Sequence, residues 1–258
     1  MDRRFTVDGI DLAAHLARPQ QLQTRGQPGV VIAHGFPAEV GGGINSTRSL
    51  PELADRIAAE AGWAALAFSS RGVGDSGGDF SLDGWLRDLR GAVHHLRDSV
   101  VCDGVWLVGF GTGGAIAIQA GADDPTIAGV AAVAAPADFE DWARSPRKLL
   151  VTAREIGVIT DGDFPPAMDT WSDGLRSVRA ADAAATLAPR PLFVVHGGDD
   201  ESVPVFDARA VADAHGAADL RIIDGAGHHL RHDPRAIAVL LGWLDRQRAE
   251  LVASRPGG

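Results

Sequence analysis

The sequence predicts an α/β fold, in which a mostly parallel sheet of eight strands carries helices on both faces. The chain has 258 residues, of which 45% are hydrophobic, enough for one large buried core. Apolar, β-prone runs alternate with segments of helical periodicity, a pattern typical of parallel strands joined by helices. One segment, residues 136–188, breaks this alternation and predicts a small helical lid within a single domain, residues 1–258.

Eight short apolar runs are the expected strands. Residues 5–7 and 12–16 flank the turn Asp8-Gly9 and predict a leading antiparallel pair. Residues 29–33 (GVVIA) are apolar or small throughout, which is typical of a buried strand. The other expected strands are residues 64–68, 105–108, 127–134, 192–195 and 220–223.

Helices are expected between these runs, where apolar residues recur every three or four positions. The clearest covers residues 82–96, with Ser81 as its N-cap. Apolar residues also recur at helical spacing over residues 50–61, and residues 237–244 mark a closing helix.

Residues 136–188 show no strand pattern and are too long for a simple connection between neighbouring elements. Trp142, Phe164, Met168 and Trp171 occur there among prolines and charged residues. This segment is expected to form a small helical lid over a pocket, and a plain surface insertion is the alternative.

Composition excludes several classes of function. The net charge of −10 disfavours a nucleic-acid groove or an anionic membrane surface as partner. Cys102 is the single cysteine, so the chain has neither a disulfide framework nor a cysteine-based metal site. No apolar run approaches the roughly 20 residues of a membrane span, and no signal peptide is visible. A cytoplasmic location is therefore expected.

The most informative segment is residues 105–116, where an apolar run enters a glycine-rich turn and an Ala/Ile-rich helical stretch leaves it. In the G-x-S-x-G nucleophile elbow, a serine occupies such a strand-to-helix turn, and small flanking residues let the backbones approach closely. Gly109 and Gly113 fill the flanking positions, whereas Gly111 stands where the serine is expected. Glycine has no atom that can attack a carbonyl group.

Four other short motifs each follow an expected strand. They are residues 34–36 (HGF), 71–77 (RGVGDSG), 200–204 (DESVP) and 225–228 (GAGH). With these segments in this order, the chain resembles the α/β-hydrolase family over essentially its whole length. Each segment is weakly specific alone, and the four together are strongly specific.

The resemblance implies a role for each site residue. Asp200 is expected to orient His228, as the acid of a catalytic triad orients its base. The backbone N–H groups of Phe36 and Thr112 are expected to form the oxyanion hole, which Gly111 leaves intact because it needs no side chain. No metal or organic cofactor is implied.

His34, Trp142 and Trp171 are the expected substrate-binding residues. The tryptophans of the lid favour an apolar acyl or aromatic ligand, and packing of the lid onto the body is their other interpretation. His34 ends a strand, so its alternative role is a hydrogen bond to the backbone of the turn.

Other residues compete weakly for these roles. Asp199 and Asp138 are alternative acids, but the offset to the Val-Pro pair at 203–204 favours Asp200. His229 and His232 could join His228 in a metal site, but carboxylates at a convincing spacing are lacking. Ser76 lies in a literal G-x-S-x-G, residues 74–78, yet no strand-to-helix turn surrounds it.

Three interpretations fit a triad without its serine. In the leading one, the protein hydrolyses a small carboxylic ester or amide, with His228 activating water and the oxyanion hole stabilising the tetrahedral intermediate. In the second, the fold is a module that binds a small ligand without cleaving it. In the third, glycine deliberately replaces serine to trap a substrate. A small acyl molecule is the expected partner, and the oligomeric state stays open.

The glycine-rich turn also fits the dinucleotide-binding fingerprint, as Gly109-x-Gly111-x-x-Gly114. That fingerprint belongs to the first βαβ unit of a nucleotide-binding fold, whereas several strands and helices precede this turn. Dinucleotide binding is therefore a minority hypothesis.

Overall fold

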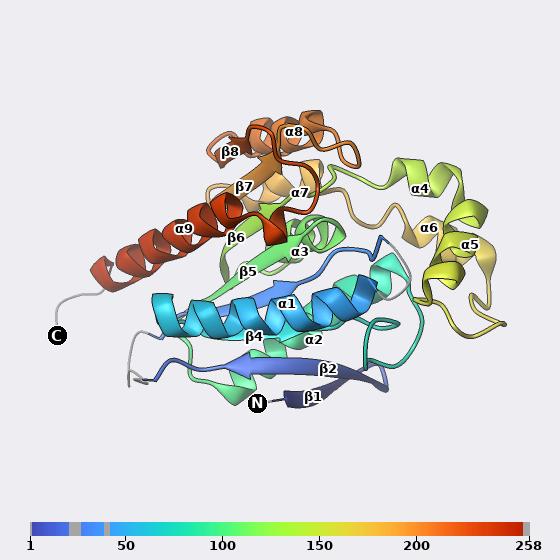
Figure 1. Cartoon of the computed structure of the whole chain (residues 1–258), viewed down its shortest axis with the longest axis horizontal. Coiled ribbons are helices and arrows are strands. Elements are labelled where there is room, and N and C mark those ends of the chain that lie inside the picture. Colours follow the sequence, from blue (N-terminus) through green and yellow to red (C-terminus); the bar gives the residue numbers. More distant parts are fainter. Residues whose placement is uncertain (1, 21–26, 39–41, 255–258) are drawn as a thin grey trace.

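The computed structural model describes residues 2–20, 27–38 and 42–254, without the side chains of residues 2–3 and 42–48 (Figure 1). Residues 39–41 of the loop after the third strand lie outside the described part. Within that part, eight strands form one sheet in the order β1-β2-β4-β3-β5-β6-β7-β8. The strands are β1 (Asp2–Val7), β2 (Ile10–Ala17), β3 (Gly29–Ala33), β4 (Ala64–Phe68), β5 (Val105–Phe110), β6 (Ile127–Val133), β7 (Leu192–Gly197) and β8 (Asp219–Ile223).

Strand directions place the carboxyl ends of the central strands at one edge. β1 pairs antiparallel with β2, and β2 pairs antiparallel with β4. The pairs from β4 through β3, β5, β6 and β7 to β8 are all parallel. The loops that leave β3, β5 and β7 therefore meet at the same edge, where ligands bind in open parallel sheets.

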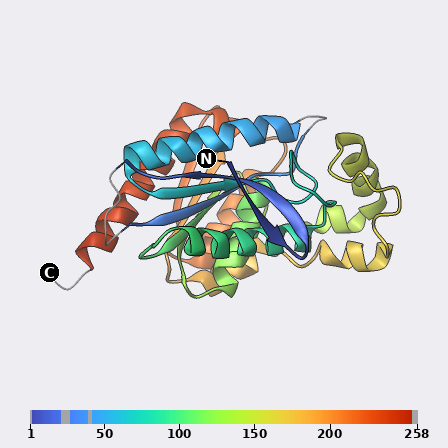
Figure 2. The same cartoon turned by 90° about the horizontal axis from the view of Figure 1, so that it is seen from below.

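Helices cover both faces of the sheet, because side chains along each buried strand alternate between two cores. In β3, Val31 and Ala33 belong to one core, and Val30 and Ile32 belong to the other. This arrangement confirms the expected fold (Figure 2). The helices are α1 (Gly42–Arg56), η1 (Ile57–Ala61), α2 (Leu82–Ser99), α3 (Thr112–Asp123), α4 (Glu140–Arg144), α5 (Pro146–Ile156), α6 (Met168–Gly174), α7 (Ala180–Leu187), α8 (Val205–His215), η2 (Leu230–His232) and α9 (Pro234–Ala253).

The segment expected to form a lid divides into two parts. Helices α4, α5 and α6 lie beyond the edge of the sheet, on the right of Figure 1. Helix α7 instead packs against α3 and α8, within the layer that covers the sheet. Its alanines at 180, 183 and 184 are buried there, so residues 180–188 belong to the body.

Helix α2 begins as the sequence predicts. The hydroxyl of Ser81 accepts a hydrogen bond from the backbone N–H of Gly84, at 3.2 Å, which satisfies a donor of the first turn. Of the helices that the structure describes, none is both long and apolar enough to cross a membrane.

Candidate functional site

The turn between β5 and α3 is held tight by glycines. A Cβ atom at Gly109 would lie 2.2 Å from the carbonyl oxygen of Gly113, and one at Gly113 would lie 2.4 Å from that of His34. Both separations are far below van der Waals contact, so only glycine fits these two positions. Between them, Gly111 has φ 53° and ψ −124°, a backbone conformation that side-chain-bearing residues rarely adopt.

Gly111 itself has room for a side chain. A Cβ atom there would lie 3.6 Å from Nε2 of His228 and 3.6 Å from Cα of Gly35, both ordinary contact distances. The backbone N–H of Gly111 donates to the carbonyl oxygen of Val133 at 2.8 Å, which ties the turn to β6. The turn therefore presents residue 111 directly to the imidazole of His228.

Asp200 holds that imidazole. Nδ1 of His228 donates to Oδ2 of Asp200 at 2.9 Å. The side chain of Asp200 is completely buried, whereas that of His228 is 28% exposed. The other carboxylate oxygen, Oδ1, accepts the backbone N–H groups of Ser202 and Val203, both at 2.9 Å. These donors fix the carboxylate of Asp200. Because an ionised carboxylate only accepts hydrogen bonds, Nδ1 of His228 carries the proton and Nε2 is the basic atom.

His196, at the end of β7, supports the turn that carries Asp200. Its Nε2 donates to the carbonyl oxygen of Val203 at 2.9 Å and lies 3.4 Å from Oδ2 of Asp200. The imidazole is fully buried.

The two residues expected to supply oxyanion-hole amides, Phe36 and Thr112, lie beside the same cavity. Thr112 is the first residue of α3, and the first N–H groups of a helix have no acceptor within the helix. Phe36 follows β3, in a loop so close to β5 that a Cβ at Gly35 would lie 3.0 Å from the carbonyl oxygen of Phe110. Phe36, Thr112, Gly111 and His228 all line one cavity. A carbonyl oxygen bound there would meet amide donors and the positive end of a helix dipole.

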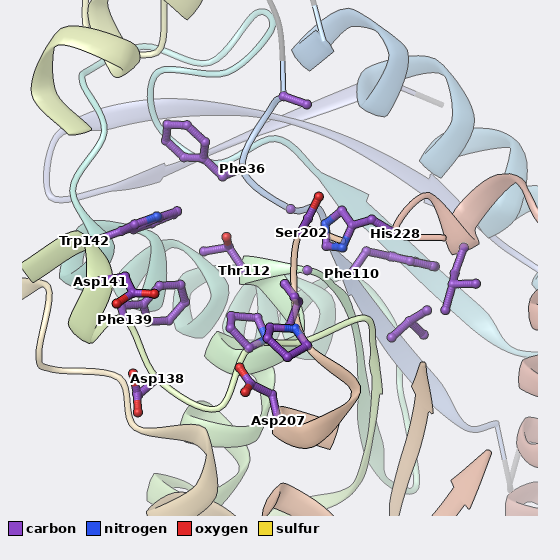
Figure 3. A pocket seen from close by; sticks show the side chains of 18 of the residues that line it. Phe36, Phe110, Thr112, Asp138, Phe139, Asp141, Trp142, Ser202, Asp207 and His228 are labelled. Atoms are coloured by element: carbon purple, nitrogen blue, oxygen red, sulfur yellow. The ribbon is translucent and has the colours of Figure 1, made fainter. Parts of the chain in front are cut away.

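The cavity has a volume of about 750 Å³. One wall is aromatic. The ring centroid of Trp142, on α4, lies 5.2 Å from the ring centroid of Phe36 and 4.9 Å from that of Phe139. Figure 3 shows these three rings on one side of the pocket and His228 on the other, with Thr112 between them. An aromatic ligand therefore has an apolar wall facing a basic nitrogen.

His34 lies outside the lining of the cavity, which differs from its expected place among the substrate-binding residues. It is buried behind the cavity, where Nδ1 donates to the carbonyl oxygen of Gly35 at 2.8 Å. Its Nε2 accepts the backbone N–H of Ser70 at 2.9 Å. Burial lowers the pKa of His34 to about 4. Both nitrogens are thus used to join two loops, as in the alternative role expected for a histidine that ends a strand.

Trp171 is also outside the lining of the cavity. Its indole is buried, and Nε1 donates to the carbonyl oxygen of Phe80 at 3.0 Å. It therefore packs α6 onto the body, while Trp142 is the lid tryptophan that lines the cavity.

The competing residues lie elsewhere or have other partners. The hydroxyl of Ser76 donates to the carbonyl oxygen of Ser69 and accepts the N–H of Ala13, beside β2. Asp138 lines the cavity, but its Oδ1 accepts the N–H of Glu140. Within the described residues, no cluster of three or more histidine, cysteine, aspartate or glutamate side chains could hold a metal ion.

Several polar residues of the cavity escaped sequence reasoning, among them Ser202, Asp207 and Arg231. Ser202 lies inside the acid-bearing turn, so the 200–204 motif could have drawn attention to it. Asp207 accepts the backbone N–H of Ala137 at 3.0 Å and so ties α8 to the start of the lid. That pairing spans 70 residues and carries no sequence signal.

The comparisons with known proteins agree with this fold. A family model described as the alpha/beta hydrolase family matches residues 30–240. The chain belongs to the α/β-hydrolase family. Among solved structures, Est1E from Butyrivibrio proteoclasticus with bound ferulic acid is 22% identical, with a TM-score of 0.73, over 98% of this chain and 100% of that one.

Two further hydrolase structures show the same fold. The α/β hydrolase GrgF from Penicillium sp. sh18 is 23% identical, with a TM-score of 0.74, over 96% of this chain and 99% of that one. Proline iminopeptidase from Mycobacterium smegmatis is 15% identical, with a TM-score of 0.66, over 97% of this chain and 99% of that one. The fold also speaks against dinucleotide binding, because the glycine-rich turn follows the fifth strand of the chain and not the first strand of a βαβ unit.

Proposed function

We propose that the protein hydrolyses small carboxylic esters or amides by direct attack of water, without an acyl-enzyme. His228 acts as the general base, Asp200 orients it, and Gly111 occupies the position of the missing nucleophile. The observation that carries the proposal is the 3.6 Å separation between Nε2 of His228 and a Cβ position at residue 111. A base that faces an empty nucleophile position can deprotonate a water molecule instead of a hydroxyl group.

The N–H groups of Phe36 and Thr112 stabilise the oxyanion of the tetrahedral intermediate in this mechanism. His228 removes the proton of water as its oxygen attacks the carbonyl carbon, and the imidazolium then protonates the leaving alcohol or amine. In a serine protease without its triad, binding and the oxyanion hole alone leave roughly 10³–10⁴-fold acceleration over water. Slow turnover is therefore physically reasonable without a serine.

An aromatic acyl group is the substrate class that the cavity favours. The rings of Phe36, Phe139 and Trp142 form its apolar wall. The structure of Est1E with ferulic acid gives an aromatic acid as ligand of a protein with this fold. We therefore choose 4-nitrophenyl benzoate as the test substrate.

Hydrolysis of this ester tests the mechanism directly. The parent protein should release nitrophenolate linearly from the first turnover, because no acyl-enzyme accumulates. His228→Ala should lower the rate at least about 100-fold, since a positioned general base contributes about 10²–10⁴-fold. A burst of one equivalent in the parent, or full activity of His228→Ala, would overturn the proposal.

Restoring the hydroxyl tests the position of residue 111. Gly111→Ser should react covalently with a fluorophosphonate probe, and the parent should not. Labelling should survive Ser202→Ala in the Gly111→Ser background and disappear with His228→Ala. If Gly111→Ser stays unlabelled while folded, residue 111 is not at the nucleophile position.

Ligand binding without turnover is the second candidate, favoured by the same glycine, because a bound ester would escape acylation. In that case ferulic acid or the ester should raise the melting temperature of the parent. No nitrophenolate should appear with either the parent or His228→Ala. The rise in melting temperature should persist in His228→Ala, reduced only by the loss of one contact to the ligand.

A further inference from the structure

We propose that the same site enolises small arylalkyl ketones: His228 removes a proton from the carbon next to the carbonyl group. The inference rests on the Asp200–His228 pair and the amide donors of the proposed function, but it needs neither water attack nor a cleavable bond. Enolisation requires a base beside the C–H bond and donors for the oxygen on which negative charge develops. The cavity offers both.

The base is free to act on carbon. Within the described part of the chain, Nδ1 is the only nitrogen of His228 with a hydrogen-bond partner, the carboxylate of Asp200. Nε2 therefore keeps its lone pair for a substrate. A serine at residue 111 would place a hydroxyl donor in front of this atom, and glycine places none.

The shape of the turn admits a carbon atom in reach of Nε2. The space in front of Gly111 is bounded by Nε2 of His228 and Cα of Gly35, each 3.6 Å from the Cβ position. Without a side chain, a substrate methylene group can enter this space and contact the imidazole. Its neighbouring carbonyl oxygen then lies on the side of the Thr112 and Phe36 amides, which line the same cavity.

The charge distribution supports an enolate. Thr112 begins a helix of 12 residues, whose N-terminus carries partial positive charge. The carboxylate of Asp200 is buried against Nδ1 and stabilises the imidazolium that forms. Charge thus separates between two groups that the fold already holds in place.

The step balances without a co-reactant. Nε2 takes the proton, the C–H electron pair becomes the π bond of the enolate, and the carbonyl π pair moves onto oxygen. Return of a proton from the imidazolium restores the ketone. In D₂O the returned particle is a deuteron, so the net result is exchange of the hydrogens next to the carbonyl group.

The probe is 1-phenylpropan-2-one, which has such hydrogens and neither an ester nor an amide bond. Proton NMR in D₂O measures the loss of its CH₂ and CH₃ signals, and tryptophan fluorescence measures its binding. The parent should accelerate exchange at least about 100-fold over free imidazole at the same concentration. Gly111→Ser should lower this acceleration at least about tenfold, because the hydroxyl occupies Nε2.

His228→Gln should reduce exchange to the background rate. His94→Gln is the matched control and should keep the parent rate, since His94 is exposed on α2 and absent from the lining of this cavity. Circular dichroism verifies that each variant is folded. The proposal is overturned if the ketone fails to bind, if the bound ketone exchanges no faster than with imidazole, or if His228→Gln retains the acceleration.

This test is independent of the hydrolysis assay. 4-Nitrophenyl benzoate has no hydrogen on the carbon next to its carbonyl group, so it reports water attack alone. Ketone exchange without benzoate hydrolysis removes the proposed hydrolase activity and leaves the enolisation site. Benzoate hydrolysis without ketone exchange removes the enolisation proposal alone.

Discussion

Glycine at residue 111 changes backbone strain as well as chemistry. The turn holds this residue at φ 53° and ψ −124° whichever side chain it carries, because Gly109 and Gly113 are locked between backbone atoms. A residue with a Cβ in such a conformation costs about 1–3 kcal/mol, and glycine avoids that cost. Gly111→Ser should therefore add a nucleophile and lower the free energy of unfolding at the same time.

Gly111→Ala isolates the strain from the chemistry. The added methyl group meets only ordinary contacts, at 3.6 Å, so the expected loss of about 1–3 kcal/mol in the free energy of unfolding comes from the backbone. Urea denaturation measures it. Gly162→Ala is the control, because no atom lies within 4 Å of its Cβ position and its φ is not positive. Equal stability of the two variants would mean that the turn relaxes.

At the scale of elements, a buried ion pair joins the loop after β4 to helix α2. Nη2 and Nε of Arg71 donate to Oδ1 of Asp88 at 2.7 and 3.1 Å, and the backbone N–H of Arg71 donates to Oδ2 at 2.8 Å. Nε1 of Trp85 donates to the carbonyl oxygen of Arg71 at 2.9 Å. The RGVGDSG motif thus begins with a residue that anchors the loop, and this loop supplies the N–H of Ser70 that His34 accepts.

Asp88→Asn should cost about 3–5 kcal/mol in the free energy of unfolding, because the buried guanidinium of Arg71 then keeps only the half-exposed carboxylate of Asp8, at 3.2 Å, as a counter-charge. Glu60→Gln removes a carboxylate from the exposed Arg56–Glu60 pair and should cost less than about 1 kcal/mol. Urea denaturation of both variants tests the contrast. Similar midpoints for the two would show that burial of the pair adds nothing.

The elements themselves were predictable because their signals are local. The central strands β3, β4, β5 and β6 are apolar runs, and the close packing at Gly109 and Gly113 is encoded by glycine at positions where only glycine fits. The segment with α4, α5 and α6 was predictable only as an interruption of the strand–helix alternation, since its short helices lack long apolar periodicity. Helix α7 covers the sheet because it contacts α3 and α8. The sequence of α7 does not encode these contacts by itself.

At the scale of the whole molecule, sequence order placed the site better than it placed the walls of the cavity. Parallel strands bring the loops that follow β5, β7 and β8 to one edge, so Gly111, Asp200 and His228 could be expected together. Whether a side chain at a strand end or on α6 faces the cavity or the interior depends on packing against distant segments. His34 and Trp171 face the interior for this reason.

The burial of His34 makes the stability of the whole fold depend on pH. Its pKa is about 4 in the folded protein, against an ordinary value of 6.5, first because burial disfavours the cation and also because Arg231 repels it. Between pH 6.5 and pH 4, the imidazole of His34 is protonated in the unfolded chain and neutral in the folded protein. This contribution is therefore complete above pH 6.5 and is lost as the pH falls towards 4, by about 3 kcal/mol in total.

Urea denaturation at pH 7 and pH 5 should reveal about 2 kcal/mol of this loss in the parent. His34→Gln keeps a donor and an acceptor at the site but cannot titrate, so the difference between the two pH values should shrink by that amount. His94→Gln, which replaces an exposed histidine, should keep the parent's difference. If His34→Gln shows the same pH dependence as the parent, proton uptake at other groups governs acid destabilisation, and the imidazole that joins the two loops takes no part in it.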